Sequence, residues 1–412
     1  MKRAILALTV LLSLFLAACG GTSTSSTSRL TDRVFASNTY SNTVHIIDAT
    51  ADTLSSYTVG SGTAPTFLAI PPGTKPIAKT LIYNSGGPSV TVTTNSTEST
   101  AGTISLPSAV TSMVVQNTSV GIVAMPGLLC SGSLGAVAFL DIASQYDTVA
   151  LVCVPSARTL VLSNSGDTVM VFNNSSNAVT LIDTTSYALR TVTLAAPAFD
   201  HPVWAAFSSD DSTAYVLNCG PQCGGTTAGV QAINVSAGTA AGTLLILSAA
   251  DTGLLSGSTF YVAGTTAGAS GAGVLSVVNV SSTTPTLSSS VAIGDGYHTL
   301  MAVGSNNKLF IGAKQCTDNP NSSTPSGCLS MYDTSAKTVV IDSARDLLYC
   351  DPAPASCTHA KGDVTGIAAV TGRSVMYVVE GSILRIFSTS SSSETGQIST
   401  GGAVYGVVAV DK

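Results

Sequence analysis

Charged side chains are scarce in this sequence. Asp, Glu, Lys and Arg make up only 9% of its 412 residues, whereas 45% are hydrophobic and 38 residues are Gly. Such a chain is too apolar to stay disordered and too poor in charge to be typical of a helical protein. The formal net charge is −6, and it becomes −8 without residues 1–18, which hold Lys2 and Arg3 and no acid. Because a nucleic-acid surface needs clustered cations, this balance argues against a nucleic-acid partner.

Several catalytic motifs are absent as well. There is no Cys-x-x-Cys-His for covalent haem, because Cys357-Thr358-His359 lacks the first Cys. There is also no Gly-x-Ser-x-Gly, no Walker loop and no His-Glu-x-x-His. Acidic residues are too sparse to nominate the paired carboxylates of a glycosidase. From the sequence we therefore assign no catalytic residue, no metal and no cofactor.

The first 18 residues have the pattern of a signal peptide. Lys2 and Arg3 form a basic start, and residues 4–15 form an apolar stretch too short for a comfortable membrane span. The stretch ends in Leu16-Ala17-Ala18-Cys19-Gly20. This ending resembles the lipobox of bacterial lipoproteins, which implies cleavage before Cys19 and attachment of acyl chains to its sulfur, enough for stable anchoring. The alternative is an ordinary signal peptide with an incidental Cys.

Residues 19–32 follow as a tether. Residues 20–28 are all Gly, Ser or Thr, so they cannot build a core and are typical of a flexible linker. Together, these segments predict a protein held by a lipid anchor in the bacterial cell envelope, outside the cytoplasm, at the outer membrane or cell surface. Its folded domain is expected over residues 33–412.

One phrase of ten residues occurs twice in this domain. Ser41-Asn42-Thr43-Val44-His45-Ile46-Ile47-Asp48-Ala49-Thr50 returns with few changes at residues 176–185, and weaker copies follow. Each unit contains short runs of alternating or β-branched residues broken by Gly, Asn, Asp and Ser, which is typical of antiparallel strands and turns. A repeat of this length predicts a closed or stacked all-β array.

The repeated units are incomplete at the two ends of the domain. If the strands of a unit are named A to D, residues 34–59 supply B, C and D with no A before them. Residues 404–410 supply an A strand with nothing after it. Pairing of these two segments would close a ring without a covalent bond and remove two exposed strand edges. Counting A strands predicts an all-β propeller of eight four-stranded antiparallel blades, with seven blades as the alternative.

The repeat also resembles a known family. Ser-Asn-Thr-Val-x-x-Ile-Asp, together with Ala214-Tyr215-Val216-Leu217-Asn218 after a Ser-Asp turn, resembles the YVTN-type β-propeller repeat. The resemblance extends over essentially all of residues 33–412, although only units one, four and five match closely. It implies radially arranged blades with strand A nearest the axis. It implies no single function, because the wider group includes surface-layer proteins, sugar-lactone hydrolases and cofactor-bearing reductases.

Many C strands end in an acidic or amide side chain. We interpret these side chains as acceptors for backbone N–H groups of the following turn, in preference to metal ligands. They are Asp48, Asp141, Asp183, Asn234, Asn279 and Asp333.

Eight cysteines follow Cys19. An even number in an exported chain suggests disulfides, and pairing of sequence neighbours is the simplest arrangement. Reduced buried thiols are the alternative; zinc is disfavoured because no second close pair of Cys or His completes four ligands around Cys219 and Cys223. The expected pairs are Cys130–Cys153, Cys219–Cys223, Cys316–Cys328 and Cys350–Cys357.

All eight cysteines are expected on one face of the propeller. Successive strands alternate in direction, so the B–C and D–A loops share a face, and these loops carry the cysteines. The longest connections, residues 220–229, 314–327 and 343–362, lie there too, and loops of such length are uncommon unless functional or disordered. The tether enters at the opposite face. We therefore expect the cysteine-bearing face to point away from the membrane and to be the recognition surface.

Polar and aromatic residues gather at the axial end of the same face. Trp204 and Tyr405 occupy equivalent positions of their A strands and are expected at the channel mouth. The histidines and nearby aspartates suffice in kind for a metal or a general base, but they sit on different blades, and separate strand-end roles are the alternative. The candidate ligand-binding residues are His201, Trp204, Tyr297, His298, His359, Asp363 and Tyr405.

These features favour a binding or scaffold module over an enzyme. Rigid blades that present variable loops suit recognition of a protein, a peptide or a glycan. The alternative is a propeller enzyme, such as a lactonase-like hydrolase or a metal- or cofactor-dependent enzyme, with its site at the axial mouth of the same face. A structural protein of the cell envelope without a small ligand is a third possibility.

Overall fold

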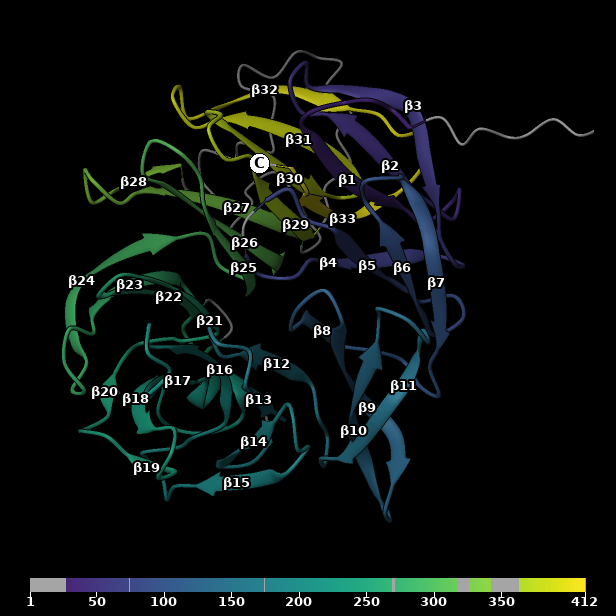
Figure 1. The fold of residues 1–412 in the computed structure, drawn as a ribbon. Coiled ribbons are helices and arrows are strands. Elements are labelled where there is room, and N and C mark those ends of the chain that lie inside the picture. Colours follow the sequence, from purple (N-terminus) through teal and green to yellow (C-terminus); the bar gives the residue numbers. More distant parts are fainter. Residues whose placement is uncertain are drawn as a thin grey trace, which may run out of the picture.

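Short runs of β-branched and aromatic residues, broken by turn residues, form antiparallel strands throughout the described part of the domain. The structure is a computed structural model that describes residues 27–73, 75–173, 175–268, 271–317, 326–341 and 363–411. Its strands form eight sheets that follow one another around a ring (Figure 1). The chain is therefore an eight-bladed β-propeller, as the strand count predicted, and the alternative of seven blades is excluded.

Each blade is a meander whose strands neighbour one another in chain order, except at the closure of the ring in blade 1 and at an extra short strand in blade 5. Blade 1 combines β33 (Val404–Ala409) with β1 (Arg33–Asn38), β2 (Thr43–Asp48) and β3 (Thr53–Gly60). Blades 2 to 4 are formed by β4 (Pro65–Ala69), β5 (Lys79–Asn84), β6 (Ser89–Thr94) and β7 (Ser99–Ser105); β8 (Ser112–Val115), β9 (Val120–Cys130), β10 (Ser133–Asp141) and β11 (Asp147–Cys153); and β12 (Thr159–Leu162), β13 (Thr168–Phe172), β14 (Ala178–Asp183) and β15 (Leu189–Thr193).

The second half of the ring repeats this plan. Blade 5 has β16 (Pro202–Phe207), β17 (Thr213–Asn218), a short 3-10 helix η2 (Gly220–Cys223), β18 (Gly229–Asn234), and two short strands, β19 (Thr239–Ala240) and β20 (Leu245–Ile246), that both pair with β18. Blades 6 to 8 are formed by β21 (Thr252–Ser256), β22 (Thr259–Thr265), β23 (Gly273–Asn279) and β24 (Thr286–Ile293); β25 (Tyr297–Val303), β26 (Lys308–Cys316), β27 (Ser326–Asp333) and β28 (Thr338–Ile341); and β29 (Val364–Ala369), β30 (Val375–Glu380), β31 (Ile383–Ser388) and β32 (Ser393–Ile398).

The ring closes between β1 and β33. These strands pair antiparallel, with Val34 opposite Ala409 and Ala36 opposite Val407, and they lie side by side in Figure 1 as the purple and yellow ends of the chain. All four side chains are buried. The predicted closure of the ring by residues 404–410 is thus confirmed, and it leaves neither strand as a free edge.

The hydrophobic core lies between blades. One cluster of buried residues joins Tyr377 and Val379 of blade 8 to Val34 and Ile47 of blade 1, and another joins Phe172 of blade 4 to the next blade. The middle strands carry most of these side chains, since both of their faces are covered by neighbouring blades. Outer strands such as β3 are mostly exposed, with partly buried positions in between and one buried residue. Packing on both faces makes each blade a rigid support for its loops.

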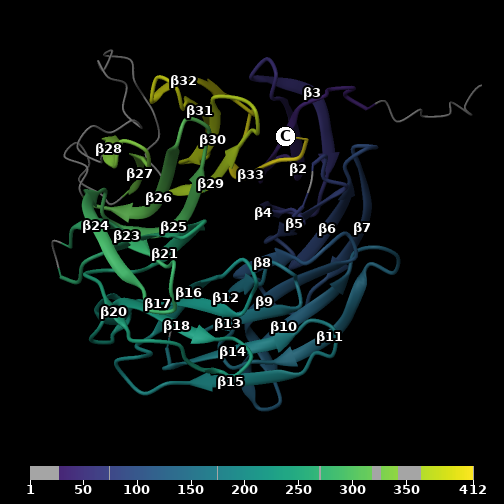
Figure 2. The same ribbon diagram turned by 60° about the vertical axis from the view of Figure 1, so that its left-hand side comes forward.

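The inner strands surround the axis, as Figure 2 shows for β4, β8, β12, β16, β21, β25, β29 and β33. Five of them, β4, β16, β25, β29 and β33, carry a register shift near their start. Such a β-bulge reorients the side chain of the extra residue. The bulges fall at Phe67, Thr299, Thr365 and Tyr405, among others, which all line the axial cavity described below.

Three disulfides join sequence neighbours. They are Cys130–Cys153, Cys219–Cys223 and Cys316–Cys328, three of the four neighbour pairs expected as the simplest arrangement. All three lie at B–C or D–A connections, on the side of the propeller that we call the disulfide face. Disulfides persist in oxidising compartments, so they indicate an extracytoplasmic location.

Other predictions fall on residues outside the described part of the chain. These are the signal peptide over residues 1–18, Cys19, the pair Cys350–Cys357, and His359. Where description begins, the chain already contacts the blades: Ser28 donates hydrogen bonds to Glu98, and Leu30 packs against the cluster around Phe35. Within the described ranges, no helix is both long and apolar enough to cross a membrane.

Candidate functional site

The inner strands of all eight blades enclose a cavity of about 580 Å³ on the propeller axis. We call it the axial cavity. Its lining residues come mostly from the first half of each inner strand, for example Ser112 of β8, Trp204 of β16 and Tyr405 of β33. Inner strands begin at the D–A loops, so the cavity lies at the disulfide face. A concave site of this size suits a small ligand or the end of a longer one, because ligand pockets typically measure roughly 300–1,000 Å³.

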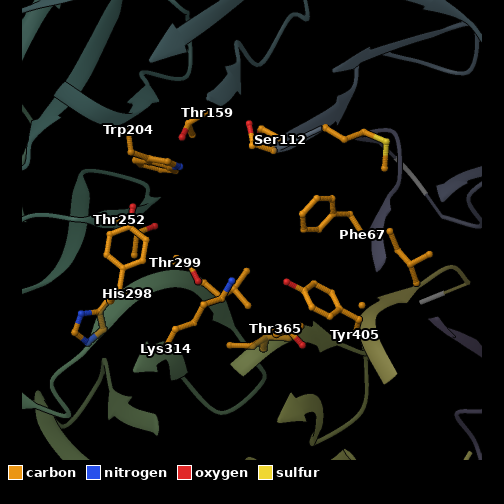
Figure 3. Close-up of a pocket in the computed structure, with 18 of the residues that line it drawn as sticks. Phe67, Ser112, Thr159, Trp204, Thr252, His298, Thr299, Lys314, Thr365 and Tyr405 are labelled. Atoms are coloured by element: carbon orange, nitrogen blue, oxygen red, sulfur yellow. The ribbon is translucent and has the colours of Figure 1, made fainter. Parts of the chain in front are cut away.

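Aromatic rings form part of the wall. Phe67 and Tyr405 meet edge to face, with ring centroids 5.9 Å apart and planes at 71°, while Phe260 stacks behind Trp204 at 6.0 Å. Figure 3 shows Trp204 and Tyr405 directed toward the open space from opposite sides. Trp204 is the single tryptophan of the chain. Rings supported from behind in this way present fixed apolar surfaces to a ligand.

Hydroxyl groups form another part of the cavity wall. The side chains of Ser112, Thr159, Thr252, Thr299 and Thr365 surround the open space in Figure 3, each from a different blade. The Oγ1 atoms of Thr299 and Thr365 are buried and have no hydrogen-bond partner in the described protein. Because buried hydroxyls are normally paired, these two groups are exceptions at the cavity wall.

Two cations belong to the same wall. Lys314, near the end of β26, extends toward the middle of the cavity (Figure 3), and Arg158 precedes β12. Among the described residues, no carboxylate lies within ion-pairing distance of either one. Burial and the charge of Asp251 raise the pKa of the Tyr297 phenol, and the nearby Arg158 opposes this effect.

Asp251 and His298 form a buried acid–base pair at the cavity wall. His298 Nδ1 lies 3.8 Å from Asp251 Oδ2, and His298 Nε2 lies 2.9 Å from the Gly294 carbonyl oxygen. With the Gln222 amide oriented so that its nitrogen faces Asp251, that nitrogen is 2.9 Å from Oδ2. Burial raises the pKa of Asp251, although His298 acts in the opposite direction. The pair can hold a proton next to a ligand.

The structure brings together four of the seven candidates from the sequence. Trp204, Tyr297, His298 and Tyr405 all line the axial cavity. His201 and Asp363 are not among the lining residues; each has a role in the loops around the mouth, and His359 lies outside the described residues.

The Asp200–His201 pair connects two loops. His201 Nδ1 lies 3.0 Å from Asp200 Oδ1, while the backbone N–H groups of Thr226 and Thr227 donate to Asp200 Oδ2 at 2.7 Å. Burial alone would raise the pKa of Asp200, but the hydrogen bonds lower it to about 2. The carboxylate thus joins the D–A loop before blade 5 to the B–C loop of that blade.

Two further acids act in the same way on later blades. Asp295 accepts the backbone N–H of Thr317 at 2.8 Å, and Asp363 accepts that of Gln315 at 3.0 Å. Acids that precede inner strands therefore hold described residues of the B–C connections. The negative charge of Asp363 still reaches the cavity, because burial and this charge together raise the pKa of Tyr405.

The acidic and amide residues at the ends of the C strands accept backbone hydrogen bonds, as predicted. Thr50 N donates to Asp48 Oδ1 at 2.8 Å, and corresponding bonds occur at the other five positions. At Asp141 the bond from the Ser144 backbone is the largest of several that lower its pKa to about 2. These residues stabilise C–D turns on the face opposite the disulfides.

One group of potential metal ligands occurs in the part of the chain that the structure describes. Asp295, Cys316 and Cys328 approach within 4.8 Å of one another. Cys316 and Cys328 are joined in a disulfide, so they offer no thiolate to a metal. Asp295 already accepts hydrogen bonds from Thr317. This group is a structural contact of the loop.

Sequence reasoning missed several cavity residues: Phe67, Arg158, Asp251, Lys314 and Thr365. Asp251 stands immediately before the inner strand β21. Asp295 and Asp363 occupy comparable places, two positions before β25 and one position before β29. Aligning the starts of the inner strands would have found it. Lys314 had no such signal, because it comes from the end of a B strand and not from an inner strand.

Comparisons with known proteins add support for the fold. No protein-family model and no curated protein matches the sequence, so the resemblance to YVTN repeats stays a prediction. Among solved structures, dihydro-heme d1 dehydrogenase NirN superposes with a TM-score of 0.61 at 12% identity, over 92% of this chain and 75% of that one. A functionally unknown protein from Desulfotomaculum acetoxidans superposes with a TM-score of 0.52 at 9% identity, over 92% and 99% of the two chains. At such identities the similarity concerns the propeller fold alone.

Proposed function

We propose that this chain is a lipid-anchored, extracytoplasmic binding module that takes its ligand at the axial cavity of the disulfide face. The observation that carries the proposal is the composition of the cavity. Aromatic rings, serine and threonine hydroxyls, and two cations that have no acidic partner among the described residues meet in one concave site. An apolar pocket with a few convergent polar groups is the usual form of a binding site.

The surroundings of the cavity favour recognition because they are held in place. The Cys219–Cys223 disulfide and the Asp200 carboxylate fix the B–C loop of blade 5 at the mouth, and Asp295 holds Thr317 at the described start of the B–C connection of blade 7. Loops that are ordered before a ligand arrives lose less conformational entropy on binding. A protein, peptide or glycan that projects from the cavity would meet these loops next.

Different parts of the chain support the location outside the cytoplasm and the lipid anchor. Disulfides persist outside the cytoplasm, and Leu16-Ala17-Ala18-Cys19-Gly20 resembles a lipobox. Acyl chains on Cys19 would hold the propeller at a membrane. The chain enters β1 at the face of the A–B and C–D loops, which leaves the disulfide face directed outward.

A propeller enzyme at the same cavity is the second candidate. The observation that favours it is the Asp251–His298 pair, whose buried carboxyl has a raised pKa and whose imidazole Nδ1 has no hydrogen-bond partner in the described protein. Such a pair can act as general acid or base when a substrate is bound within reach. Turnover that is lost in His298→Gln while binding persists would select this candidate over a binding module.

Trp204 provides a direct test, because it is the only tryptophan and lines the cavity. We would express the full chain, extract it in detergent, and follow tryptophan fluorescence during titration with panels of glycan fragments, peptides and small carboxylates. For a ligand of the cavity we expect a saturable change in tryptophan fluorescence, with one ligand bound per protein chain. Trp204→Phe should lose the signal while the same ligand still raises the melting temperature.

A scaffold without a small ligand gives the opposite result. In that case no panel member would change the fluorescence or the melting temperature, while partners captured on the outer loops would bind equally well after Trp204→Phe and Tyr405→Ala. That combination would overturn the axial cavity as the binding site.

A further inference from the structure

We propose that the ligand of the axial cavity is an acidic sugar, a polyhydroxylated ring that carries a carboxylate, such as a uronic acid unit at the end of a glycan. This inference rests on the proposed function and names the ligand class of the same site. It assigns the carboxylate to Lys314 and Arg158, the sugar hydroxyls to the threonine side chains, and the apolar sugar face to the aromatic wall.

The state of the cations in this protein points to an anion. Many other described cations are neutralised by carboxylates within 2.6–3.0 Å: Arg33 by Asp411 and Glu98, Arg373 by Asp52, and Arg385 by Glu380 and Glu394. Lys308 is likewise paired with Asp333. Lys314 and Arg158 are different, because no described carboxylate is within ion-pairing distance of them and both line a cavity. Two such cations in a chain of net charge −6 form a local attraction for a negative group.

The hydroxyl groups point to a ligand with many polar atoms. Thr159, Thr252, Thr299 and Thr365 reach the cavity from four blades, and the last two have buried Oγ1 atoms without a partner in the described protein. A flat hydrocarbon or a simple carboxylate has too few polar atoms to pair with hydroxyls on several sides of the cavity. A sugar ring carries hydroxyls around its edge and can pair with donors and acceptors on several sides at once.

The aromatic residues complete the match. Trp204, Phe67 and Tyr405 offer ring faces and edges to the same space. The C–H bonds on one face of a sugar ring are apolar and slightly positive, so they pack against the negative face of an aromatic ring. A cavity of about 580 Å³ holds one or two such units and leaves the rest of a glycan over the disulfide face.

Acidic groups near the cavity set the electrostatic balance. Asp251 lies in the wall beside His298, and Asp363 lies at the mouth near Tyr405. Both oppose a bound carboxylate when ionised. Because Asp363 accepts a hydrogen bond from the Gln315 backbone through Oδ1, the Asp363→Asn change can keep this bond and remove only the charge.

The experiment compares three probes on the full chain. The probes are a galacturonic acid disaccharide, its methyl ester, and the neutral galactose disaccharide of the same linkage, each followed by Trp204 fluorescence and by calorimetry. We expect the acid to bind about tenfold or more tightly than its ester, because a charge-assisted hydrogen bond to the carboxylate is lost in the ester. We also expect the affinity for the acid to fall with increasing salt.

Four variants separate electrostatics from folding. Lys314→Gln and Arg158→Gln should each weaken binding of the acid by about tenfold and leave the weak binding of the ester nearly unchanged. Asp363→Asn should strengthen binding of the acid by about two- to threefold by removing a like charge. Lys337→Gln, an exposed cation in the turn before β28, is the matched control and should bind as the wild type does. A variant that merely misfolds cannot bind more tightly. Stronger binding by Asp363→Asn would therefore support an electrostatic interaction with the ligand carboxylate independently of the weakened variants.

Two outcomes would overturn the inference, and they differ from failure of the proposed function. If the acid, its ester and the neutral disaccharide all quench Trp204 with equal affinity, the cavity binds sugars but not through an anion. If none of the three has an effect while a peptide or an aromatic carboxylate does, the cavity is a binding site for another ligand class. Loss of every response, including those of the wider panels, would instead reject the cavity itself.

Discussion

Arg33 and Asp411 form a bidentate ion pair at the place where the propeller closes, although 378 positions separate them in the sequence. Arg33 Nε lies 2.7 Å from Asp411 Oδ2, Nη2 lies 2.8 Å from Oδ1, and the Arg33 backbone N–H also donates to Oδ2 at 2.8 Å. The two side chains are only 10% and 7% exposed. Hydrogen bonding to Asp411 is the main reason why the pKa of Arg33 is raised. The seam is therefore held by this ion pair as well as by the β1–β33 ladder.

Breaking this ion pair should weaken the closure. Arg33→Gln is expected to lower the free energy of unfolding by about 2–3 kcal/mol, because it removes the cation that pairs with the mostly buried Asp411 carboxylate. Asp411→Asn should cost less, about 1–2 kcal/mol, because Arg33 keeps its ion pair with Glu98. Arg33→Lys should recover only part of the loss, since an ammonium cannot make the bidentate contact. A double-mutant cycle by urea unfolding measures the coupling between the two residues. Additive effects of the two single changes would contradict a direct role at the seam.

The closure shows what the sequence can and cannot predict. Residues 34–59 and 404–410 have strand patterns that are local, so their pairing followed from counting strands. The ion pair between Arg33 and Asp411 depends on strand register, which a bulge between Ala36 and Asn38 shifts. No local pattern encodes that shift.

The same distinction applies to the axial cavity. Trp204 and Tyr405 were placed at the channel mouth because they occupy equivalent positions of repeated strands, and both line the cavity. Lys314 was not predicted, because it belongs to a B strand. Its side chain nevertheless extends into the cavity that the inner strands surround. Long-range placement of this kind depends on how the blades pack, which periodicity does not describe.

Asp200 should make the protein less stable in acid. Its pKa is lowered from the ordinary 3.8 to about 2 by hydrogen bonds from His201, Thr226 and Thr227, although burial opposes the shift. The stabilisation is complete above the unfolded value of 3.8 and is lost as the pH falls through about 2. A shift of this size corresponds to about 2 kcal/mol. Asp200→Asn should therefore lower the free energy of unfolding at neutral pH by about this amount and flatten its dependence on pH between 2 and 5.

Gly225→Ala offers a control that keeps the Asp200 charge. A Cβ atom at Gly225 would lie 1.9 Å from Asp200 Oδ1, so the loop must move away from the carboxylate. We expect Gly225→Ala, like Asp200→Asn, to lower the stability at neutral pH and to flatten its dependence on pH in the acidic range. Thermal unfolding over a pH series measures both effects. An unchanged pH profile in both variants would show that Asp200 does not hold the loop.

The three disulfides should differ in their contribution to stability. Their sequence separations are 23, 12 and 4 residues for Cys130–Cys153, Cys316–Cys328 and Cys219–Cys223. In the chain-entropy treatment these loops correspond to about 3, about 3 and about 2 kcal/mol of stabilisation. Replacing each pair by Ser and comparing urea midpoints should therefore rank the Cys219–Cys223 pair lowest. A larger loss for that pair than for Cys130–Cys153 would mean that it acts through native contacts around η2.

Cys19→Ser tests the lipid anchor independently of the fold. A lipidated Cys19 would place the full chain in the membrane fraction, because several acyl chains give stable anchoring. We expect the Ser variant to lose lipid labelling and to leave the membrane fraction, with its three described disulfides intact by mass spectrometry. Membrane association that survives the substitution would contradict the anchor. Ala18→Ser, which keeps a small residue before the expected cleavage site, is the matched control.

Asp251 should affect stability in the direction opposite to Asp200. Burial raises its pKa above the ordinary 3.8 even though His298 acts to lower it, so the folded protein holds the proton more firmly than the unfolded chain does. The contribution of Asp251 is then complete below 3.8, and it decreases as the pH rises, until the carboxyl ionises in the folded state. Asp251→Asn stays neutral and keeps an oxygen that can accept from Gln222, so it should remove this decrease.

The measurement is the difference in melting temperature between Asp251→Asn and the wild type at each pH from 3 to 8. This difference should grow in favour of the variant as the pH rises and then level off, whereas the difference for Asp200→Asn should grow in favour of the wild type over the acidic range. Opposite slopes from two aspartates at the same face would show that burial dominates at the cavity wall and hydrogen bonding dominates in the loops. Parallel slopes would mean that Asp251 is ionised at low pH, and a proton held next to His298 would then not be available to a ligand or substrate.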